Sequence, residues 1–422
     1  MQLEPWQSPP TLARRLADPQ WALFYSSLQT GYSGRYSLLA CSPVEEVRSG
    51  AVAALKPKLS RHEPHLDNAW FGYIGYGADT GLEPPLPARQ GFIELPPVCM
   101  TRFATIYRFD HFLRRLTRHG PPARLRGEEE PSAANPPAVA ALESSLSRAE
   151  YLRAVQDVIE ALHAGEAYQV NLTRKFFGRL TAPPDALSLF ERLCEASPAP
   201  YSACLKLGDA AVLSSSPERF LTLDAQGRLE TRPIKGSAPR HIDVAEDARL
   251  RAALAASAKD RAENLMIVDL MRNDFSRVCL PGSVQVSGLY DVSSFATIHH
   301  MASVVTGRVR PERGALDALC ACFPPGSMTG APKLRAMEIA ARLEKMARGA
   351  YSGALGWFGG DGTMDLSVII RTLIVQGGRF EFQVGGGVVA DSTAEGEWRE
   401  TMVKAEGIRR ALGQEEGWLE NI

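Results

Sequence analysis

The stretch YSGALGWFGGDGTMDLSVIIRTLIVQGGRFEFQVGGGVV, residues 351–389, decides the fold class of this chain. It holds three runs rich in β-branched and aromatic residues, separated by short glycine-containing segments, and this pattern predicts strands joined by hairpins. The sequence shows no regular alternation of single strands with helices. We therefore predict an α+β fold, and not a doubly wound parallel sheet.

Further strands and helices are expected on the N-terminal side of this stretch and after it. Ser147 and Glu150 form a capping box, and apolar residues follow at helical spacing up to Gly165, which predicts a helix. The same signals predict helices at 259–273, 331–347 and 393–412. The predicted strands are 20–28, 70–77, 98–109, 167–177, 211–223, 228–234, 351–358, 365–376 and 379–389.

One segment lacks hydrophobic periodicity. Residues 121–146 combine Pro, Ala and Ser with a run of three Glu residues, a composition typical of an exposed linker. We expect it to separate an N-terminal region, 1–120, from a longer region, 147–422.

The composition is that of a globular protein. Of the 422 residues, 45% are hydrophobic and 23% are charged, and the formal net charge is −1. This balance provides no broad positive field for nucleic acid or an anionic membrane, so anions must be recognised by local groups. No apolar run reaches the ~18 residues of a membrane span, and no signal peptide is visible. Because the seven cysteines are scattered and fit no disulfide framework, we expect a cytoplasmic protein.

The segment RPIKGS, residues 232–237, places Lys235 between a proline and a glycine at the end of a predicted strand. A lysine amine becomes a nucleophile near neutral pH only where burial or a nearby cation lowers its pKa; otherwise Lys235 is a solvated hairpin residue. Glu218 lies on the facing end of the same hairpin system. It is either a general acid/base beside Lys235 or the ion-pair partner of Arg219.

Two further carboxylates lie on predicted helices. Glu263 begins an apolar helical segment that must be largely buried. Glu400 has Glu397 one turn before it and Lys404 one turn after it, so the simplest expectation is a surface glutamate with helical neighbours on the same face. If the two helices converge, carboxylate oxygens without His or Cys companions suit Mg²⁺.

Two glycine-containing segments offer backbone amides to an anion. The segment GSMTGAPK, residues 326–333, leads into a predicted helix, whose N-terminus favours a carboxylate or phosphate. The glycines at 385–387 follow a strand and allow a ligand to approach the backbone.

Arg371 interrupts the apolar run VIIRTLIV, so it belongs either to a buried ion pair or to a clamp for a substrate carboxylate. The pair His299 and His300 belongs either to the core, as histidines with satisfied hydrogen bonds, or to a site as ligand donors, and a core position is the simpler expectation. Together, the lysine, the carboxylates, the arginine and the glycine segments suit a small substrate with more than one carboxylate.

In this order the motifs resemble those of the chorismate-utilising enzymes, which include the component I subunits of anthranilate and aminodeoxychorismate synthase and the isochorismate and salicylate synthases. The resemblance covers roughly residues 147–410 and implies a large two-sheet β-sandwich core flanked by helices. The motifs that carry it are SPERF (216–220), RPIKGS (232–237), AENLMIVDLMRND (262–274), GSMTGAPK (326–333), YSGALGW (351–357), VIIRTL (368–373), GGGVVADS (385–392) and ET (400–401) with Lys404.

The resemblance implies a role for each matching residue. Glu263 and Glu400 match two Mg²⁺-binding glutamates. Lys235 looks like the covalent nucleophile of aminodeoxychorismate synthases, where anthranilate synthases carry a small residue, and Glu218 looks like the general acid. Gln169 stands where isochorismate and salicylate synthases place a water-activating lysine, so hydration at C2 is disfavoured. The other matches line the chorismate ring and carboxylates: His300, Ser327, Tyr351, Arg371, Gly385, Gly386, Gly387 and Lys404.

The activity implied by the resemblance is that of aminodeoxychorismate synthase component I, a transferase of an amino group. Such an enzyme converts chorismate and ammonia to 4-amino-4-deoxychorismate, for para-aminobenzoate and folate biosynthesis. Ammonia would come from a glutamine amidotransferase subunit, since no glutaminase motif is visible in this chain, and an aminodeoxychorismate lyase would act on the product. The alternatives are anthranilate synthase component I and a catalytically silent chorismate-binding subunit.

The N-terminal region resembles the family more weakly. Residues 35–43, RYSLLACSP, lie where tryptophan-regulated anthranilate synthases carry a Leu-Leu-Glu-Ser element, and the glutamate is missing. We therefore do not expect feedback inhibition by tryptophan.

Overall fold

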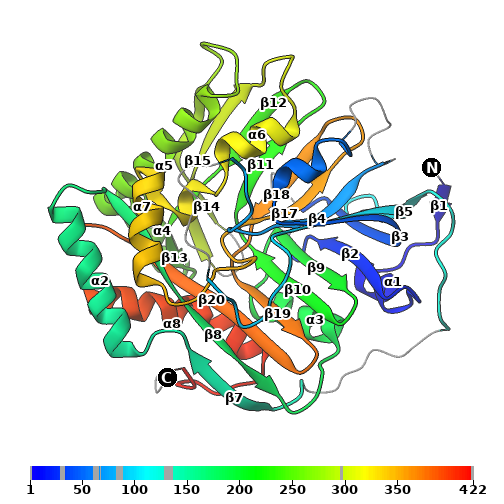
Figure 1. The fold of residues 1–422 in the computed structure, drawn as a ribbon, viewed down its shortest axis with the longest axis horizontal. Helices are drawn as coiled ribbons and strands as arrows, with labels where there is room; N and C mark the ends of the chain where they lie inside the picture. Colours follow the sequence, from blue (N-terminus) through cyan, green and yellow to red (C-terminus); the bar gives the residue numbers. More distant parts are fainter. Residues whose placement is uncertain are drawn as a thin grey trace.

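The computed structural model of the chain describes residues 2–28, 34–59, 66, 68–81, 89–127, 136–294 and 298–419. A large antiparallel sheet, with strands from the whole length of the chain, forms its centre (Figure 1). The strands are β1 (Gln2–Glu4), β2 (Gln20–Tyr25), β3 (Tyr36–Ser49), β4 (Trp70–Ile74), β5 (Val98–Asp110), β6 (Arg115–His119), β7 (Val139–Ser144), β8 (Gln169–Leu180), β9 (Tyr201–Leu207), β10 (Ala210–Ser216), β11 (Arg219–Leu223), β12 (Arg228–Arg232), β13 (Ile234–Pro239), β14 (Gln285–Ser294), β15 (Ile298–Arg308), β16 (Gly330–Ala331), β17 (Ala354–Phe358), β18 (Met364–Val368), β19 (Thr372–Gln376) and β20 (Arg379–Val388).

Helices cover the outside of the sheet, and α2, α4, α5 and α7 lie on the side of the molecule away from the N-terminal strands (Figure 1). In the part of the chain that the structure describes, no helix is long and apolar enough to cross a membrane. The helices are α1 (Pro9–Arg14), α2 (Arg148–His163), α3 (Ala186–Ala196), α4 (Val244–Ala256), α5 (Ala258–Ser276), α6 (Ala315–Cys322), α7 (Lys333–Leu343) and α8 (Ala394–Ala411), with short 3₁₀ turns η1 (Val52–Leu55) and η2 (Gly326–Met328).

Strand pairing joins the N-terminal and C-terminal regions into one body. Strand β2 pairs with β9, and β4 pairs with β17, so strands from before residue 120 lie between strands from after residue 200. Pairing runs from β14 and β13 through β15, β12, β11, β18, β17, β4, β5, β3, β2, β9, β10, β19 and β20 to β8, which also pairs with β7 and β16.

The sheet folds back on itself, and its two layers enclose an apolar core. Side chains of β4, β5 and β17 share one buried cluster with side chains of β2, β9, β10 and β19. Phe24 of β2 contacts Phe71 of β4 with ring centroids 5.7 Å apart, although these two strands do not pair. The prediction of an α+β fold with a two-layered β core is therefore confirmed. Strand pairing connects the two layers into one continuous hydrogen-bonded sheet.

Local signals placed most of the predicted elements correctly. The Ser147 side chain accepts a hydrogen bond from the Glu150 backbone, and the Glu150 side chain accepts one in return, so the predicted capping box begins α2. The hairpin of β11 and β12 turns at Asp224–Gly227, as predicted, and Gly227 has a φ of 77° there.

Several parts of the prediction need correction. The predicted strand 211–223 is divided into β10 and β11, and the predicted strand 365–376 is divided into β18 and β19. Within the range predicted as a linker, 121–146, residues Val139–Ser144 form β7 and pair with β8; residues 128–135 lie outside the described residues. Strand β3 was not predicted, because its run contains Pro43 and several charged residues. Its pairing with β5 shifts register between Pro43 and Glu45, and such an irregularity tolerates proline.

Candidate active site

The candidate site forms where the two ends of the strand order meet. Lys235 lies on β13, and Gly387 lies on β20. A Cβ atom placed on Gly387 would lie only 3.3 Å from Lys235 Nζ. The lysine predicted from RPIKGS therefore lies against the glycine strand, about 150 residues further along the chain.

The surroundings of Lys235 suit an amine nucleophile. Burial lowers the pKa of Lys235, and the ammonium group of Lys404 adds to this effect. The carboxylates of Glu263, Glu218 and Glu400 partly offset it. The structure thus brings together five of the residues that the motifs predicted, and Lys235 is not a solvated hairpin lysine.

Glu218 is a buried carboxyl with its own hydrogen bonds. Burial raises its pKa to about 7, although the Ser327 hydroxyl and the Ile234 backbone N–H both donate hydrogen bonds to it. Arg219 contacts Asp365 instead, with Nη2 3.3 Å from Oδ2. Of the two roles left open by the sequence, the ion pair with Arg219 is therefore wrong, and Glu218 lies beside the lysine.

Glu263 and Glu400 converge from α5 and α8. The Lys404 ammonium lies 2.6 Å from Glu400, and Lys259 lies 3.7 Å from Glu263. Burial raises the pKa of Glu263; it also acts on Glu400, but there Lys404 and Lys235 outweigh it, and the pKa of Glu400 is lowered. The expected surface pairing of Glu400 with Lys404 is thus present, and it occurs at the site.

Glu397 is a site residue that the sequence did not reveal. It was expected on the surface, yet it is only 4% exposed, and its Oε2 atom has no hydrogen-bond partner among the described residues. A Cβ atom on Gly386 would lie 2.3 Å from this oxygen. Burial and the neighbouring Glu400 raise the pKa of Glu397. No pattern in the sequence distinguishes Glu397 from an exposed helical glutamate.

Arg371 has the features of a substrate clamp. Within the described ranges no carboxylate forms an ion pair with it, and burial alone lowers its pKa.

His300, which is buried opposite Ser237, lies within electrostatic reach of Arg371. Burial, reinforced by that guanidinium, lowers the pKa of His300 to about 3, so the imidazole is neutral. The expected core position is confirmed for His299, whose Nδ1 lies within hydrogen-bond distance, 2.8 Å, of Ser294 Oγ.

The glycines at 385–387 have a packing role in the structure. They pair with β8, where a Cβ atom on Gly385 would lie 2.3 Å from the Leu172 carbonyl oxygen. The Gly385 carbonyl accepts a hydrogen bond of 2.8 Å from Lys404 Nζ. These close approaches explain why residues with side chains are excluded here.

A buried ion pair that the sequence did not reveal supports Ser327 and Tyr351. Arg348 binds Glu344 at 2.7 Å and donates hydrogen bonds of 2.8 Å to the carbonyls of Met328 and Asn171. It therefore connects the loop that carries Ser327 to β8. Tyr351 lies near this pair, and burial raises the pKa of its hydroxyl.

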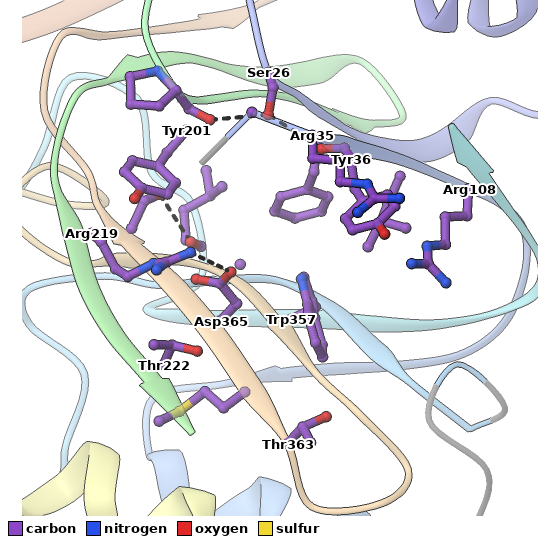
Figure 2. A pocket seen from close by; sticks show the side chains of 18 of the residues that line it. Ser26, Arg35, Tyr36, Arg108, Tyr201, Arg219, Thr222, Trp357, Thr363 and Asp365 are labelled. Atoms are coloured by element: carbon purple, nitrogen blue, oxygen red, sulfur yellow. Dashed lines mark hydrogen bonds and ion pairs between the residues drawn. The ribbon is translucent and has the colours of Figure 1, made fainter. Parts of the chain in front are cut away.

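A separate cavity of about 820 Å³ lies outside this cluster (Figure 2). Tyr36, Tyr201 and Trp357 line it, together with the Arg219–Asp365 ion pair. None of the predicted catalytic or metal-binding residues lines this cavity, although Arg219 directly follows Glu218 in the chain. The cavity includes residues of the segment 35–43, where feedback inhibition by tryptophan was not expected; that prediction stays untested.

Comparisons with known proteins agree with these motifs. A family model described as chorismate binding enzyme matches residues 15–410. Aminodeoxychorismate synthase component 1 of Klebsiella aerogenes is 43% identical over 85% of this chain and 80% of its own length. Anthranilate synthase component 1 of Streptomyces coelicolor is 36% identical over 97% of this chain and 87% of its own length. The crystal structure of anthranilate synthase component I from Streptococcus pneumoniae superposes with a TM-score of 0.78 at 27% identity, covering 90% of this chain and 93% of that one. The chain therefore belongs to the chorismate binding enzyme family.

Proposed function

We propose that this chain is an aminodeoxychorismate synthase component I that forms a covalent intermediate through Lys235. The observation that carries the proposal is the half-buried Lys235 amine, with its lowered pKa, beside the Glu218 carboxyl. The 43% identity to aminodeoxychorismate synthase component 1 of Klebsiella aerogenes supports the same assignment.

In this proposal chorismate binds by its two carboxylates. Arg371 lacks a carboxylate partner among the described residues, so its guanidinium is available for one of them. The neutral imidazole of His300 and the hydroxyls of Ser327 and Tyr351 complete the polar contacts. The glycine strand at 385–387 and Lys404 line the opposite side.

We propose that Mg²⁺ binds between Glu263 and Glu400, which supply only oxygen atoms. Among the described residues no three His, Cys, Asp or Glu side chains form a ready metal site, but Glu397 Oε2 is a buried acceptor without a partner among them. A magnesium ion prefers a few carboxylates and shares its other positions with water and substrate. When bound, it would neutralise a substrate carboxylate and help to hold it in place. Lys259 and Lys404 would then have to give up part of their pairing with Glu263 and Glu400.

The first chemical step is attack by neutral Lys235. Its Nζ forms a bond to C2 of chorismate, the ring double bonds shift, and the C4–O bond breaks. The leaving hydroxyl takes the proton of Glu218 and departs as water, after which Nζ returns a proton to the Glu218 carboxylate. A pKa of about 7 lets Glu218 first donate a proton and then accept one near neutral pH.

The second step consumes ammonia. Ammonia bonds to C4, the double bonds shift back, and the C2–Nζ bond breaks; Lys235 takes the proton that the new amine loses. The product is 4-amino-4-deoxychorismate, and two easier substitutions replace one difficult step. We propose that a glutamine amidotransferase subunit supplies the ammonia and that an aminodeoxychorismate lyase uses the product for para-aminobenzoate and folate biosynthesis.

A coupled assay tests the proposal. The purified chain is incubated with chorismate, Mg²⁺ and ammonium, and then with aminodeoxychorismate lyase; para-aminobenzoate is the expected product. Intact-protein mass spectrometry without ammonium should show an adduct of chorismate minus water, absent from Lys235→Ala but present in the exposed control Lys56→Ala. Direct release of anthranilate and pyruvate would overturn the assignment.

The second candidate is anthranilate synthase component I. The relative from Streptomyces coelicolor favours it, because that protein is 36% identical over 97% of this chain. Lys235 argues against it, because a small residue is expected at this position in anthranilate synthases. The same product analysis separates the two activities, and a complete lack of turnover would favour a chorismate-binding subunit without catalysis.

A further inference from the structure

Gln169 has an unused hydrogen-bond acceptor in the candidate site. It is the first residue of β8, where its backbone pairs with Ala331 of β16. The side chain is only 1% exposed, and its Oε1 atom has no hydrogen-bond partner among the described residues. A buried amide oxygen left without a partner costs free energy, so a partner that arrives or reorients during the reaction is expected.

Gly387 brings this amide close to Lys235. A Cβ atom on Gly387 would lie 1.9 Å from Gln169 Nε2 and 3.3 Å from Lys235 Nζ. The amide of Gln169 therefore occupies the space that a side chain at Gly387 would take, and the amine lies against the same point. The Nε2 end of the amide faces this point, and a half-turn of the amide about its last side-chain bond, which exchanges Nε2 and Oε1, would turn the acceptor toward Lys235 Nζ.

The carboxylates around the Lys235 amine are less suited than an amide oxygen to accept a hydrogen bond from its neutral form. A carboxylate that accepts a hydrogen bond from Lys235 stabilises the ammonium form, which has no lone pair for attack. A neutral amide oxygen accepts an N–H bond with less preference for the charged form. The charged groups that act on Lys235 are Glu263, Lys404, Glu218 and Glu400.

We infer that Gln169 is a positioning residue for Lys235: its Oε1 accepts a hydrogen bond from the neutral amine and directs the lone pair of Nζ at C2 of chorismate. Gly387 is required because any side chain there would displace the amide. This inference rests on the proposed function, since it assigns Gln169 to the step in which the Nζ–C2 bond forms.

The test measures adduct formation on Lys235 in a single turnover, by rapid quenching and mass spectrometry without ammonium. In Gln169→Met, which keeps the length but lacks the acceptor, the adduct should form roughly 10- to 100-fold more slowly, with unchanged affinity for chorismate. Gln169→Glu retains an acceptor but favours the ammonium, so its rate should recover as the pH rises, whereas that of Gln169→Met should not. A normal rate in Gln169→Met would overturn the inference, because a residue that only fills space is replaced well by methionine.

The matched control is Gln383→Met. Gln383 is also a buried glutamine whose Oε1 has no partner among the described residues, but it lies four residues before Gly387 on β20 and bonds to Thr173. Its replacement should leave the rate of adduct formation unchanged; an equal loss in this variant would overturn the inference in favour of a general packing effect.

A crystal structure of the wild-type protein separates failure of this inference from failure of the proposed function. A Gln169 Oε1 to Lys235 Nζ distance of about 2.7–3.2 Å supports the contact even if wild-type protein forms no adduct, in which case the proposed function alone fails. A Gln169 amide turned away from Lys235 in the chorismate complex overturns the inference while the adduct still supports the proposed function.

Discussion

The Ser327 hydroxyl donates a hydrogen bond to the Glu218 carboxylate, and this bond ties the short turn η2, which precedes α7, to the segment between β10 and β11. Even with this donor, burial raises the pKa of Glu218 to about 7. Glu218 therefore exchanges its proton near neutral pH.

The first prediction concerns the pH dependence of activity. Because the proposed mechanism needs protonated Glu218, kcat/KM for chorismate should fall as the pH rises through about 7. In Glu218→Gln this alkaline limb should disappear, and the remaining activity should be on the order of 100-fold lower. Rates between pH 5.5 and 9 test this. A limb near pH 7 that survives in the variant would mean that another group titrates there.

The second prediction concerns stability. Between the ordinary pKa of 4.5 and about 7, the folded protein binds more protons at Glu218 than the unfolded chain does, so the contribution of this group to stability falls as the pH rises through that window. Above pH 7 the free energy of unfolding has lost at most about 3 kcal/mol through this group. Urea unfolding should therefore give Glu218→Gln a higher free energy of unfolding than wild type at pH 8. At pH 5 the two free energies should differ much less. An equal difference at both values would contradict the raised pKa.

The third prediction concerns the metal. Glu263→Gln should weaken Mg²⁺ binding by on the order of 10- to 100-fold, as measured by calorimetry without substrate. The control is Asp269→Asn on the same helix, because Asp269 is exposed and, among the described residues, forms an ion pair only with Arg272, at 2.8 Å. Equal Mg²⁺ affinity in Glu263→Gln and wild type would remove Glu263 from the metal site.

How much of this the sequence predicts depends on the range of the interactions. The capping box of α2 and the turn at Asp224–Gly227 are local, so patterns found them. The roles proposed for Lys235 and Glu218 rest on contiguous motifs, so a family resemblance could suggest them. The burial of Glu397 depends on the missing side chain of Gly386, and that of Arg348 depends on carbonyls as distant as Asn171. Such long-range contacts leave no periodic signal in a single sequence.

The fourth prediction decides between clamp and structural roles for Arg371. Because no described carboxylate pairs with it, Arg371→Lys should leave the melting temperature nearly unchanged. The KM for chorismate should rise roughly 10- to 100-fold, since lysine cannot bind a carboxylate through two parallel hydrogen bonds. A large fall in melting temperature with normal KM would assign Arg371 to the core instead.

The fifth prediction tests the contact between β20 and α8. In Gly386→Ala the new Cβ would lie 2.3 Å from Glu397 Oε2 and 3.5 Å from Glu400 Oε1, so the carboxylates or the first turns of α8 must move. Such overpacking costs about 1–3 kcal/mol of stability, and Mg²⁺ affinity should fall with it. Gly378→Ala is the matched control, because its new Cβ would have no atom closer than 3.4 Å, and both quantities should stay near wild type. If urea unfolding and Mg²⁺ titration gave the same values for Gly386→Ala and Gly378→Ala, Glu397 would not be held against the glycine strand, and its place in the metal site would be lost.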